Sequence, residues 1–498
     1  MLFGLLDRAL LLHRFGFRYL SEDDAIVQLA ARDYAHGVFR EPCFYGQDYN
    51  PLLEAFIAAP FIALGAKPWS ILPVVTSILA LLPFWSFGLW HYRRGGHAAS
   101  AVFAAMPLLL PVEHGMMTTI SRGFVSGIGV LAFVPWTLGL RTAAWRYGVT
   151  GLVLYTAAWF NPNSTVFSVA AAAMMIIGAS QQARESAWCF VGALPFAFIQ
   201  YASNAWYAAR PGYAVYSIHD WRMDFHPEAI PEGVGNLALH FKWLCPVAWE
   251  QGWLAAPILL LILAIHFRDR RWPVVLGLCS AIALIAFSFS FGKVHDGEAN
   301  VFYPAPRMFL AVPLLLCWAL AQCDRAMVFQ WLPWVVLAAG IASFSVKGVC
   351  MAEVVHEQLE NQPGQVSETA LADLRADADL MLGLCDRHSV KAIVMLCTRD
   401  RSKQLHRAYF YPLLHERMPP GRVYPEDRRH WQRIWAGTPV LGNVLVTGGD
   451  PERWNALVAA DPRILDVSES IAGPLHILHG NTEPLDSIAD RSGELRRR

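Results

Sequence analysis

The sequence predicts an all-α polytopic membrane domain over residues 1–346, followed by a small α/β domain over residues 347–498. Hydrophobic residues make up 55% of the 498 residues and charged residues only 16%, whereas an average soluble protein carries about 25% charged residues. Apolar runs that could span, or nearly span, a bilayer recur about ten times before residue 346. After residue 346 the runs stop, and short apolar strands alternate with amphipathic segments.

The charge balance and the cysteine pattern exclude several classes of protein. Lysine plus arginine and aspartate plus glutamate both number 40, so the formal net charge is zero. A nucleic-acid partner would need a concentrated basic face, and none is predicted. The nine cysteines form no CxxC pair and no Cys/His group at metal-ligand spacing.

The first twenty residues form an apolar segment that is interrupted by charges. Asp7, Arg8, Arg14 and Arg18 make it a poor eleventh span, although twenty residues could just cross about 30 Å of hydrocarbon. Either it is a short helix whose charges snorkel to the surface, or the chain begins downstream of a fuller span. No small-residue cleavage site follows, so a cleavable signal peptide is not expected.

The expected spans follow the loop 21–50. They cover residues 70–90, 98–110, 124–140, 149–160, 165–177, 188–206, 253–266, 273–291, 308–322 and 327–346. A shorter apolar run, 52–65, lies between Pro51 and Pro68 and predicts a helix at the membrane interface rather than a crossing.

Arginine is concentrated in one set of the short loops between these spans. That set holds nine arginines and no lysine, and comprises loops 91–97, 141–148, 180–187, 266–272 and 323–326. The other set holds three positive residues, and comprises loops 111–124, 161–164 and 292–307. Because positive loops face the cytoplasm, we expect the acidic loop 21–50, the long loop 207–252 and the C-terminal domain on the extracytoplasmic side.

The C-terminal domain has the alternating pattern of a small α/β fold of about 130 residues. Helices are expected over 371–388, 399–416 and 451–460, and strands over 391–397, 440–447 and 474–479. It contains no GxGxxG after a strand, no P-loop and no nucleophile elbow.

Three adjacent carboxylates stand where the short apolar N-terminus ends. Glu22, Asp23 and Asp24 are followed by a loop of about thirty polar and aromatic residues before the next apolar run. Carboxylates this close repel one another, and such repulsion can prepare one of them to accept a proton near neutral pH.

The order of these features resembles the GT-C superfamily of polytopic glycosyltransferases. The likeness rests on the acidic residues, on Tyr45 to Pro51 (YGQDYNP) leading into LLEAFIAAP, and on Asn300 to Met308 (NVFYPAPRM) before a late span. Within the superfamily the chain is most similar to bacterial family-39-like and protein-mannosyltransferase-like membrane enzymes. The resemblance covers roughly residues 19–346.

The resemblance implies an inverting transfer of a sugar from a polyprenyl-phosphate-linked donor to a glycan, lipid or protein acceptor, on the extracytoplasmic face of a bacterial inner membrane. A carboxylate would take the proton from the acceptor hydroxyl as it attacks the anomeric carbon. Asp23 or Asp24 is the candidate base, with Asp23 favoured, and Glu22 is expected to be a solvated bystander. The alternative is a structural role in which Ser21 or Asp23 caps a helix beginning near Ala25, with Asp24 favourable to its dipole. The two roles can hold at once.

Further residues of the extracytoplasmic loops are candidates for donor and acceptor binding. Cations suited to the lipid phosphate are, in order of preference, Arg307 and Arg222, followed by Lys293, His295 and Arg122. Cations at such places also bind lipid headgroups without any further role. Sugar or acceptor contacts are expected from Tyr45, Gln47, Asp48, Tyr49, Glu113 and His114. The alternatives for these are an ordinary interfacial loop and polar residues that end a helix.

No metal or cofactor is predicted. His295, Asp296 and Glu298 carry ligand types that suit Mn²⁺ or Zn²⁺, but nothing in the sequence fixes their geometry. Asn161-Pro-Asn163 is interpreted as a turn between two spans.

Two functions of other classes stay open at this stage. One is a transporter or flippase for a lipid-linked or small solute, although such proteins tend to show internal repeats and polar residues in mid-span. The other is a non-catalytic assembly subunit that uses the C-terminal domain for docking. Besides the donor and the acceptor, membrane lipids are expected partners of this chain, and nucleic acid is not.

Overall fold

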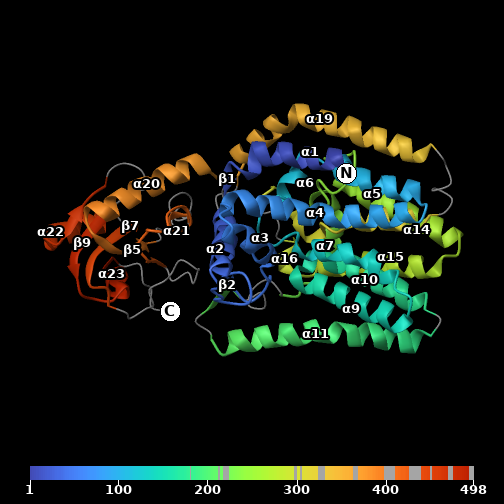
Figure 1. Cartoon of the computed structure of the whole chain (residues 1–498), viewed down its shortest axis with the longest axis horizontal. Helices are drawn as coiled ribbons and strands as arrows, with labels where there is room; N and C mark the ends of the chain where they lie inside the picture. The colour runs from blue at the N-terminus through green and yellow to red at the C-terminus, as the bar shows by residue number, and fades with distance from the viewer. Residues whose placement is uncertain are drawn as a thin grey trace.

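The computed structural model shows a bundle of helices with a small α/β domain at one end (Figure 1). The long helices of the bundle run in roughly the same direction, so their ends gather at two poles, and the α/β domain lies at one of them. The structure describes residues 1–179, 181–210, 213–216, 224–295, 300–302, 305–323, 331–362, 368–396, 410–424, 439–448, 451–468 and 475–492.

The apolar runs expected as spans fall on helices wherever the structure describes them. The helices are α1 (Leu2–Leu11), α2 (Glu22–Ala35), α3 (Leu53–Ala63), α4 (Pro68–Arg93), α5 (His97–Leu109), α6 (Val112–Met117), α7 (Ser126–Val130), α8 (Val134–Leu138), α9 (Ala143–Phe160), α10 (Thr165–Ile177), α11 (Gln182–Ala208), α12 (Ala229–Gly235), α13 (Leu237–His240), α14 (Ala255–Arg268), α15 (Trp272–Ser288), α16 (Gly292–His295), α17 (Val312–Ala321) and α19 (Leu332–Glu360). Helix α19 continues without a break past residue 346, where the composition changes.

Two helices of the described residues, α4 and α19, are long and apolar enough to cross a bilayer. Seven shorter apolar helices have 10–17 residues. The run 124–140 is divided between α7, a 3-10 turn (Leu131–Phe133) and α8. The helical character of this domain is therefore confirmed, while the number of crossings and the orientation stay predictions.

The charged N-terminal segment is a helix that packs one face against α5 and α19, and α1 continues into a π-helical turn (Leu12–Gly16). Leu2, Leu5 and Leu10 on its other face are exposed. Asp7 and Arg8 are both buried. The Asp7 carboxylate lies 2.9 Å from Nζ of Lys347 on α19, and Arg8 donates to the carbonyl oxygen of Gly115 (2.8 Å). The expectation that these two charges snorkel is wrong, because internal partners offset the cost of burying them.

Helix α3, the expected interfacial helix of run 52–65, has two unlike faces. Ala55 and Ala58 are fully buried, where the helix packs against α2 and α4. Phe56, Phe61 and Leu64 are exposed on the other side. An exposed apolar face beside the acidic loop is what a helix lying in the interface requires.

The C-terminal domain is built on a five-stranded mixed sheet in the order β6-β5-β7-β9-β8. The strands are β5 (Val390–Leu396), β6 (Gly421–Tyr424), β7 (Gly442–Gly448), β8 (Ile464–Asp466) and β9 (Leu475–Asn481), and the helices are α20 (Leu371–Arg387), α21 (Tyr411–Leu414), α22 (Pro451–Ala460) and α23 (Leu485–Ser492). Strand β5 runs parallel to β6 and β7, whereas β9 is antiparallel to β7 and β8.

The sheet is covered by helices on both faces, because alternate side chains of each strand point to opposite sides. On β5, Ile393 packs in the cluster that includes α20, whereas Val394 packs in the cluster that includes α22 and α23. The strands expected over 391–397, 440–447 and 474–479 and the helices over 371–388 and 451–460 are confirmed. Most of the helix expected over 399–416 lies outside the described residues.

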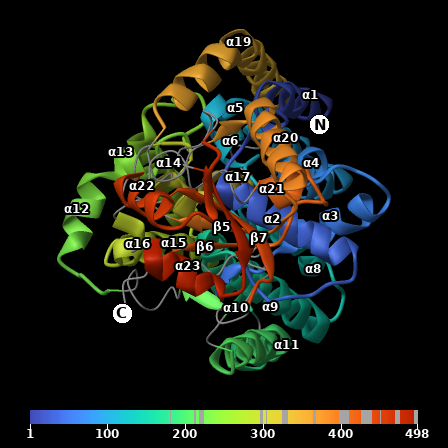
Figure 2. The ribbon, with the colours of Figure 1, turned by 90° about the vertical axis from the view of Figure 1, so that its left-hand side faces the viewer.

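The α/β domain is attached to the start of α2, the helix whose first turn carries the acidic residues. Strand β1 (Tyr19–Leu20), just before α2, pairs antiparallel with β4 (Thr369–Ala370), just before α20. Leu29 of α2 shares a hydrophobic cluster with α20, and Arg32 of α2 donates to the carbonyl of Pro412. Figure 2, seen from this end, shows the domain in front of the bundle.

Candidate active site

A capping box fixes the start of α2. Ser21 is the N-cap, and its hydroxyl accepts from the backbone N–H of Asp24 (3.3 Å). Asp24, the third residue of the helix, forms the reciprocal hydrogen bonds. Its Oδ2 accepts from the hydroxyl (2.5 Å) and from the backbone N–H (3.1 Å) of Ser21. The alternative in which Ser21 caps the helix is confirmed, but the helix begins at Glu22 rather than near Ala25.

The carboxylate of Asp24 is occupied on both sides. While Oδ2 faces Ser21, Oδ1 accepts from the backbone N–H of Ser121 (2.7 Å). Asp24 is only 5% exposed. Its oxygens therefore tie the start of α2 to the loop between α6 and α7.

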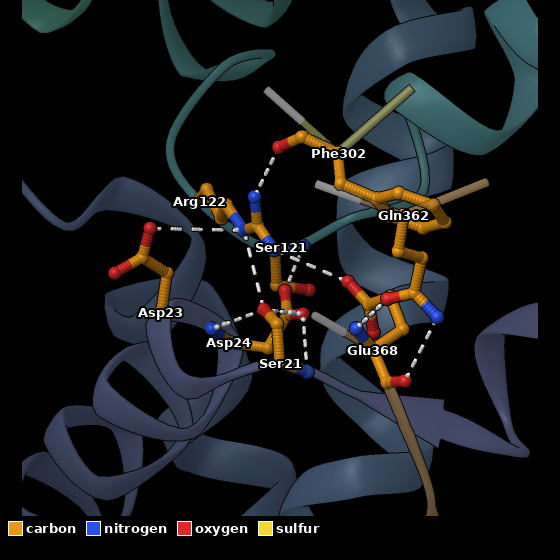
Figure 3. Close-up of polar contacts among 8 residues, drawn as sticks. All are labelled: Ser21, Asp23, Asp24, Ser121, Arg122, Phe302, Gln362 and Glu368. Carbon is orange, nitrogen blue, oxygen red and sulfur yellow. Dashed lines mark hydrogen bonds and ion pairs between the residues drawn. The ribbon is translucent and has the colours of Figure 1, made fainter. Parts of the chain in front are cut away.

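Arg122 lies at the centre of the site and joins four segments of the chain (Figure 3). Its Nε donates to the hydroxyl of Ser21 (3.2 Å), Nη1 donates to the carbonyl of Phe302, and Nη2 lies 3.2 Å from Oε1 of Glu368. The side chain is 3% exposed. Burial disfavours its charge, but the carboxylates around it, Asp24 first, outweigh burial and raise the pKa of Arg122.

Asp23 is placed differently from its neighbour. One carboxylate oxygen lies 3.9 Å from Nε of Arg122, and the side chain is 29% exposed. Figure 3 shows Asp23 on the opposite side of Arg122 from Glu368. Among the three acidic residues, Asp23 thus combines solvent access with a fixed cation beside it. Glu22 is half-buried and also contributes to the potential at Arg122.

Glu368 was not among the sequence-based candidates. Its side chain is 1% exposed. Burial, followed by the charge of Asp24, raises the pKa of Glu368 well above its usual value, although Arg122 acts in the other direction. A lone glutamate near the start of an α/β domain carries no local pattern that would have marked it.

The loop that carries Arg122 is held by three asparagine side chains. The amide groups of Asn50, Asn161 and Asn163 donate to the successive carbonyl oxygens of residues 122–124, at 2.9, 3.0 and 2.6 Å. Gly123 has a φ of +78°, and a Cβ there would meet Asn50 Oδ1 at 2.3 Å, so this close approach requires glycine. Residues 161–164 form the predicted turn between α9 and α10, which also fixes the loop.

Two of the predicted cations lie against aromatic rings near this loop. Nζ of Lys293, on α16, lies 4.3 Å from the ring centroid of Tyr49, and the guanidinium carbon of Arg307 lies 5.5 Å from that of Phe124. Such cation–π contacts orient a positive charge without neutralising it. Arg222 and the side chain of His295 lie outside the described residues, as do Asp296 and Glu298.

The loop 41–50 is mostly a structural element. Tyr45 is buried and its hydroxyl donates to Asp33 (3.2 Å), so its ring offers no face to a sugar, against expectation. Gln47 lies in strand β2 (Gly46–Gln47), which pairs with β3 (Ala214–Tyr216) of the long loop 207–252. Asp48 and Tyr49 are half-buried and stay candidates for sugar contact.

Glu41 attaches this loop to the end of α11. Tyr207 donates its hydroxyl proton to Oε2 of Glu41 (3.1 Å), and the backbone N–H of Cys43 donates to the same hydroxyl (3.1 Å). Burial raises the pKa of Glu41 to about 9. The group therefore holds a proton near neutral pH and acts as a neutral hydrogen-bonding partner.

Glu113 and His114 lie apart from this cluster, on α6. Burial raises the pKa of Glu113, and its charged neighbours are Glu250, Lys242 and Glu357. His114 is 6% exposed. The structure thus does not bring this pair into the group around Arg122. Within the part of the chain that the structure describes, no group of three His, Cys, Asp or Glu side chains is arranged to hold a metal ion.

Comparison with solved structures gives two matches that cover nearly the whole chain. They are crystal structures of ArnT from Cupriavidus metallidurans, one bound to undecaprenyl phosphate and one in the apo state. Each has a TM-score of 0.55 and covers 96% of this chain and 97% of ArnT, at 12% and 11% sequence identity. At this level of identity the likeness shows the fold, and the chain has the fold of ArnT.

The resemblance inferred from the acidic loop and the order of runs is therefore confirmed at the level of the fold. No protein-family model and no curated protein sequence matches the chain. The match to ArnT includes the α/β domain, because it extends over 96% of the residues. The likeness in fold therefore extends over both the helical bundle and the C-terminal domain.

Proposed function

We propose that this chain is an inverting glycosyltransferase that transfers a sugar from a polyprenyl-phosphate-linked donor. The proposal places the chain in a bacterial inner membrane, with the site on the extracytoplasmic side. The observation that carries it is the position of Asp23, a partly exposed carboxylate 3.9 Å from a buried arginine at the start of α2. The GT-C-like fold supports it, because one ArnT structure of that fold holds undecaprenyl phosphate.

In the proposed reaction the acceptor oxygen forms a bond to the anomeric carbon as the bond from that carbon to the phosphate oxygen breaks. Asp23 takes the acceptor proton, and polyprenyl phosphate leaves with the bonding electrons. Arg122, whose Nε lies 3.9 Å from the carboxylate, keeps Asp23 oriented before the attack.

The departing phosphate gains negative charge and needs cations. Lys293 and Arg307 are the described candidates, since both lie against aromatic rings beside the loop 122–124. Their positions support a role in donor binding. Tyr49, whose ring lies against Lys293, and the preceding residue Asp48 are the proposed sugar contacts. The acceptor is a glycan, lipid or protein.

The test is transfer in membranes that contain the wild-type chain, with a panel of undecaprenyl-phosphate-linked hexoses, pentoses and amino sugars, each labelled in the sugar. We expect release of undecaprenyl phosphate together with a labelled product of inverted configuration. Binding of undecaprenyl phosphate to the purified protein is measured in parallel. Absence of both binding and transfer across the panel would refute the proposal.

A further inference from the structure

The residue that joins the C-terminal domain to the bundle lies inside the candidate site. Glu368 stands directly before β4, and its buried carboxylate contacts Arg122 at 3.2 Å. The two residues are 246 positions apart in the sequence. Figure 3 shows Arg122 between Glu368 on one side and Asp23 on the other.

The backbone of Glu368 is fixed from both directions. Upstream, its N–H donates to Oε1 of Gln362, and Nε2 of Gln362 donates to the carbonyl oxygens of Leu359 (2.8 Å) and Glu368 (3.3 Å). Downstream, β4 pairs with β1, and the N–H of Leu371 donates to the carbonyl of Arg18 (2.7 Å). The carboxylate therefore reaches Arg122 from a backbone that cannot shift freely.

A small cavity lies on the inner side of this contact. It has a volume of about 10 Å³, room for about one water, and its lining includes Asp24, Gln28 and Glu368. Gln28 is fully buried, and within the described residues neither of its amide atoms has a hydrogen-bond partner. A water in this cavity could satisfy the amide of Gln28.

We propose that Glu368 is a positioning residue of the active site, which holds the guanidinium of Arg122 beside Asp23. The junction of the C-terminal domain is thereby part of the site rather than a separate docking module. The proposal rests on the proposed function only in giving Asp23 the role of base.

The electrostatics agree with this role. Burial, followed by the charge of Asp24, raises the pKa of Glu368 well above its usual value. Whether or not it is protonated, Oε1 of Glu368 can accept the hydrogen bond from Nη2 of Arg122. The guanidinium held in this way acts on Asp23 and Asp24.

The experiment measures the reactivity of Asp23 itself, in the purified full-length chain, by carbodiimide coupling to glycine ethyl ester with mass-spectrometric localisation. Coupling needs access to the carboxyl group, and Arg122 covers one of its oxygens at 3.9 Å, so a displaced Arg122 increases labelling at Asp23. We compare the labelling rate of Asp23 in Glu368→Ala and Glu368→Gln with that in the wild type. Arg122→Gln gives the labelling rate of Asp23 when the guanidinium is absent. Glu353→Gln, an exposed site on α19, is the matched control, and the exposed Asp373 is the internal standard.

We expect Glu368→Ala to raise the labelling rate of Asp23 by about two- to five-fold, the effect of losing a partly exposed ion pair, with Asp373 unchanged. Glu368→Gln should behave like the wild type, because its amide oxygen accepts the same bond from Arg122. If Glu368→Ala does not fold, Glu368→Asp, whose shorter side chain falls short of Arg122, is expected to give the same increase.

Unchanged labelling of Asp23 in both Glu368→Ala and Glu368→Asp overturns the proposal, and so does a parallel increase at Asp373, which indicates general loosening. The transfer assay separates failure of the positioning role of Glu368 from failure of the proposed function. An active wild type with unchanged Asp23 labelling defeats the positioning role alone. The expected labelling in a chain that transfers from no donor defeats the proposed function alone.

Discussion

The replacement Asp23→Asn tests the proposed base with the least change of shape. Asparagine keeps an oxygen that can face Arg122, so the loss is that of the proton acceptor. A positioned general base contributes about 10²- to 10⁴-fold to a rate, which corresponds to about 2.7 to 5.5 kcal/mol of transition-state stabilisation. The side chain is 29% exposed and its ion pair is 3.9 Å long, so the cost in stability is at most about 1 kcal/mol.

The adjacent replacement Asp24→Asn should affect stability more than turnover. The oxygens of Asp24 face donors on both Ser21 and Ser121, and an amide can satisfy only one side. The unpaired buried donor costs about 1–3 kcal/mol. We therefore expect a lower unfolding temperature, with turnover per folded molecule reduced less than in Asp23→Asn.

The assay is labelled-sugar transfer at matched expression, read as kcat and KM, together with thermal unfolding in detergent. Asp373→Asn, an exposed aspartate in the first turn of α20, is the matched control. We expect kcat to fall in Asp23→Asn while donor KM stays within about two-fold. Retained turnover in both Asp23→Asn and Asp24→Asn would refute the mechanism. Loss of kcat in Asp24→Asn alone would assign the role of base to Asp24.

Three further predictions concern Arg122, Glu41 and Lys293. Arg122→Lys should lower the unfolding free energy by about 3 kcal/mol or more in chemical denaturation, because one ammonium cannot replace the guanidinium's contacts to three segments in a buried site. An unchanged denaturation midpoint would show that these contacts do not stabilise the fold. Glu41→Gln should flatten the pH dependence of stability. In the folded wild type the pKa of Glu41 is about 9, whereas an ordinary glutamate has a pKa of 4.5, so between these values the folded chain binds a proton that the unfolded chain has lost. The wild-type unfolding free energy therefore falls as pH rises from 4.5 to 9, by at most about 1.4 kcal/mol per pH unit. Unfolding temperatures from pH 5 to 9 measure this slope, and equal slopes in both proteins would refute it. Lys293→Ala should weaken binding of undecaprenyl phosphate about ten-fold or more, the value of one charge-assisted hydrogen bond, whereas Lys391→Ala, at an exposed site on β5, should leave it unchanged.

Part of the candidate site could be found from the sequence because it is encoded locally. Three adjacent acidic residues after a serine indicate a helix start with spare carboxylates, and the structure has a capping box there. The aromatic and amide residues of 45–51 could be seen as a group in the same way. What these residues do depends on what lies against them: Tyr45 is enclosed in a hydrophobic cluster, whereas Tyr49 meets Lys293.

The sequence by itself determined the helical runs, the strands β5, β7 and β9, and the resemblance to GT-C enzymes, because periodicity and residue order are local properties. Only the tertiary structure decided which carboxylate is buried and which is accessible. It also brought Glu368 to Arg122 across 246 positions and placed Asn50, Asn161 and Asn163 on one loop. Such contacts arise from the packing of α2, the loop 122–124 and the C-terminal domain, and the local pattern around each residue carries no information about its partner.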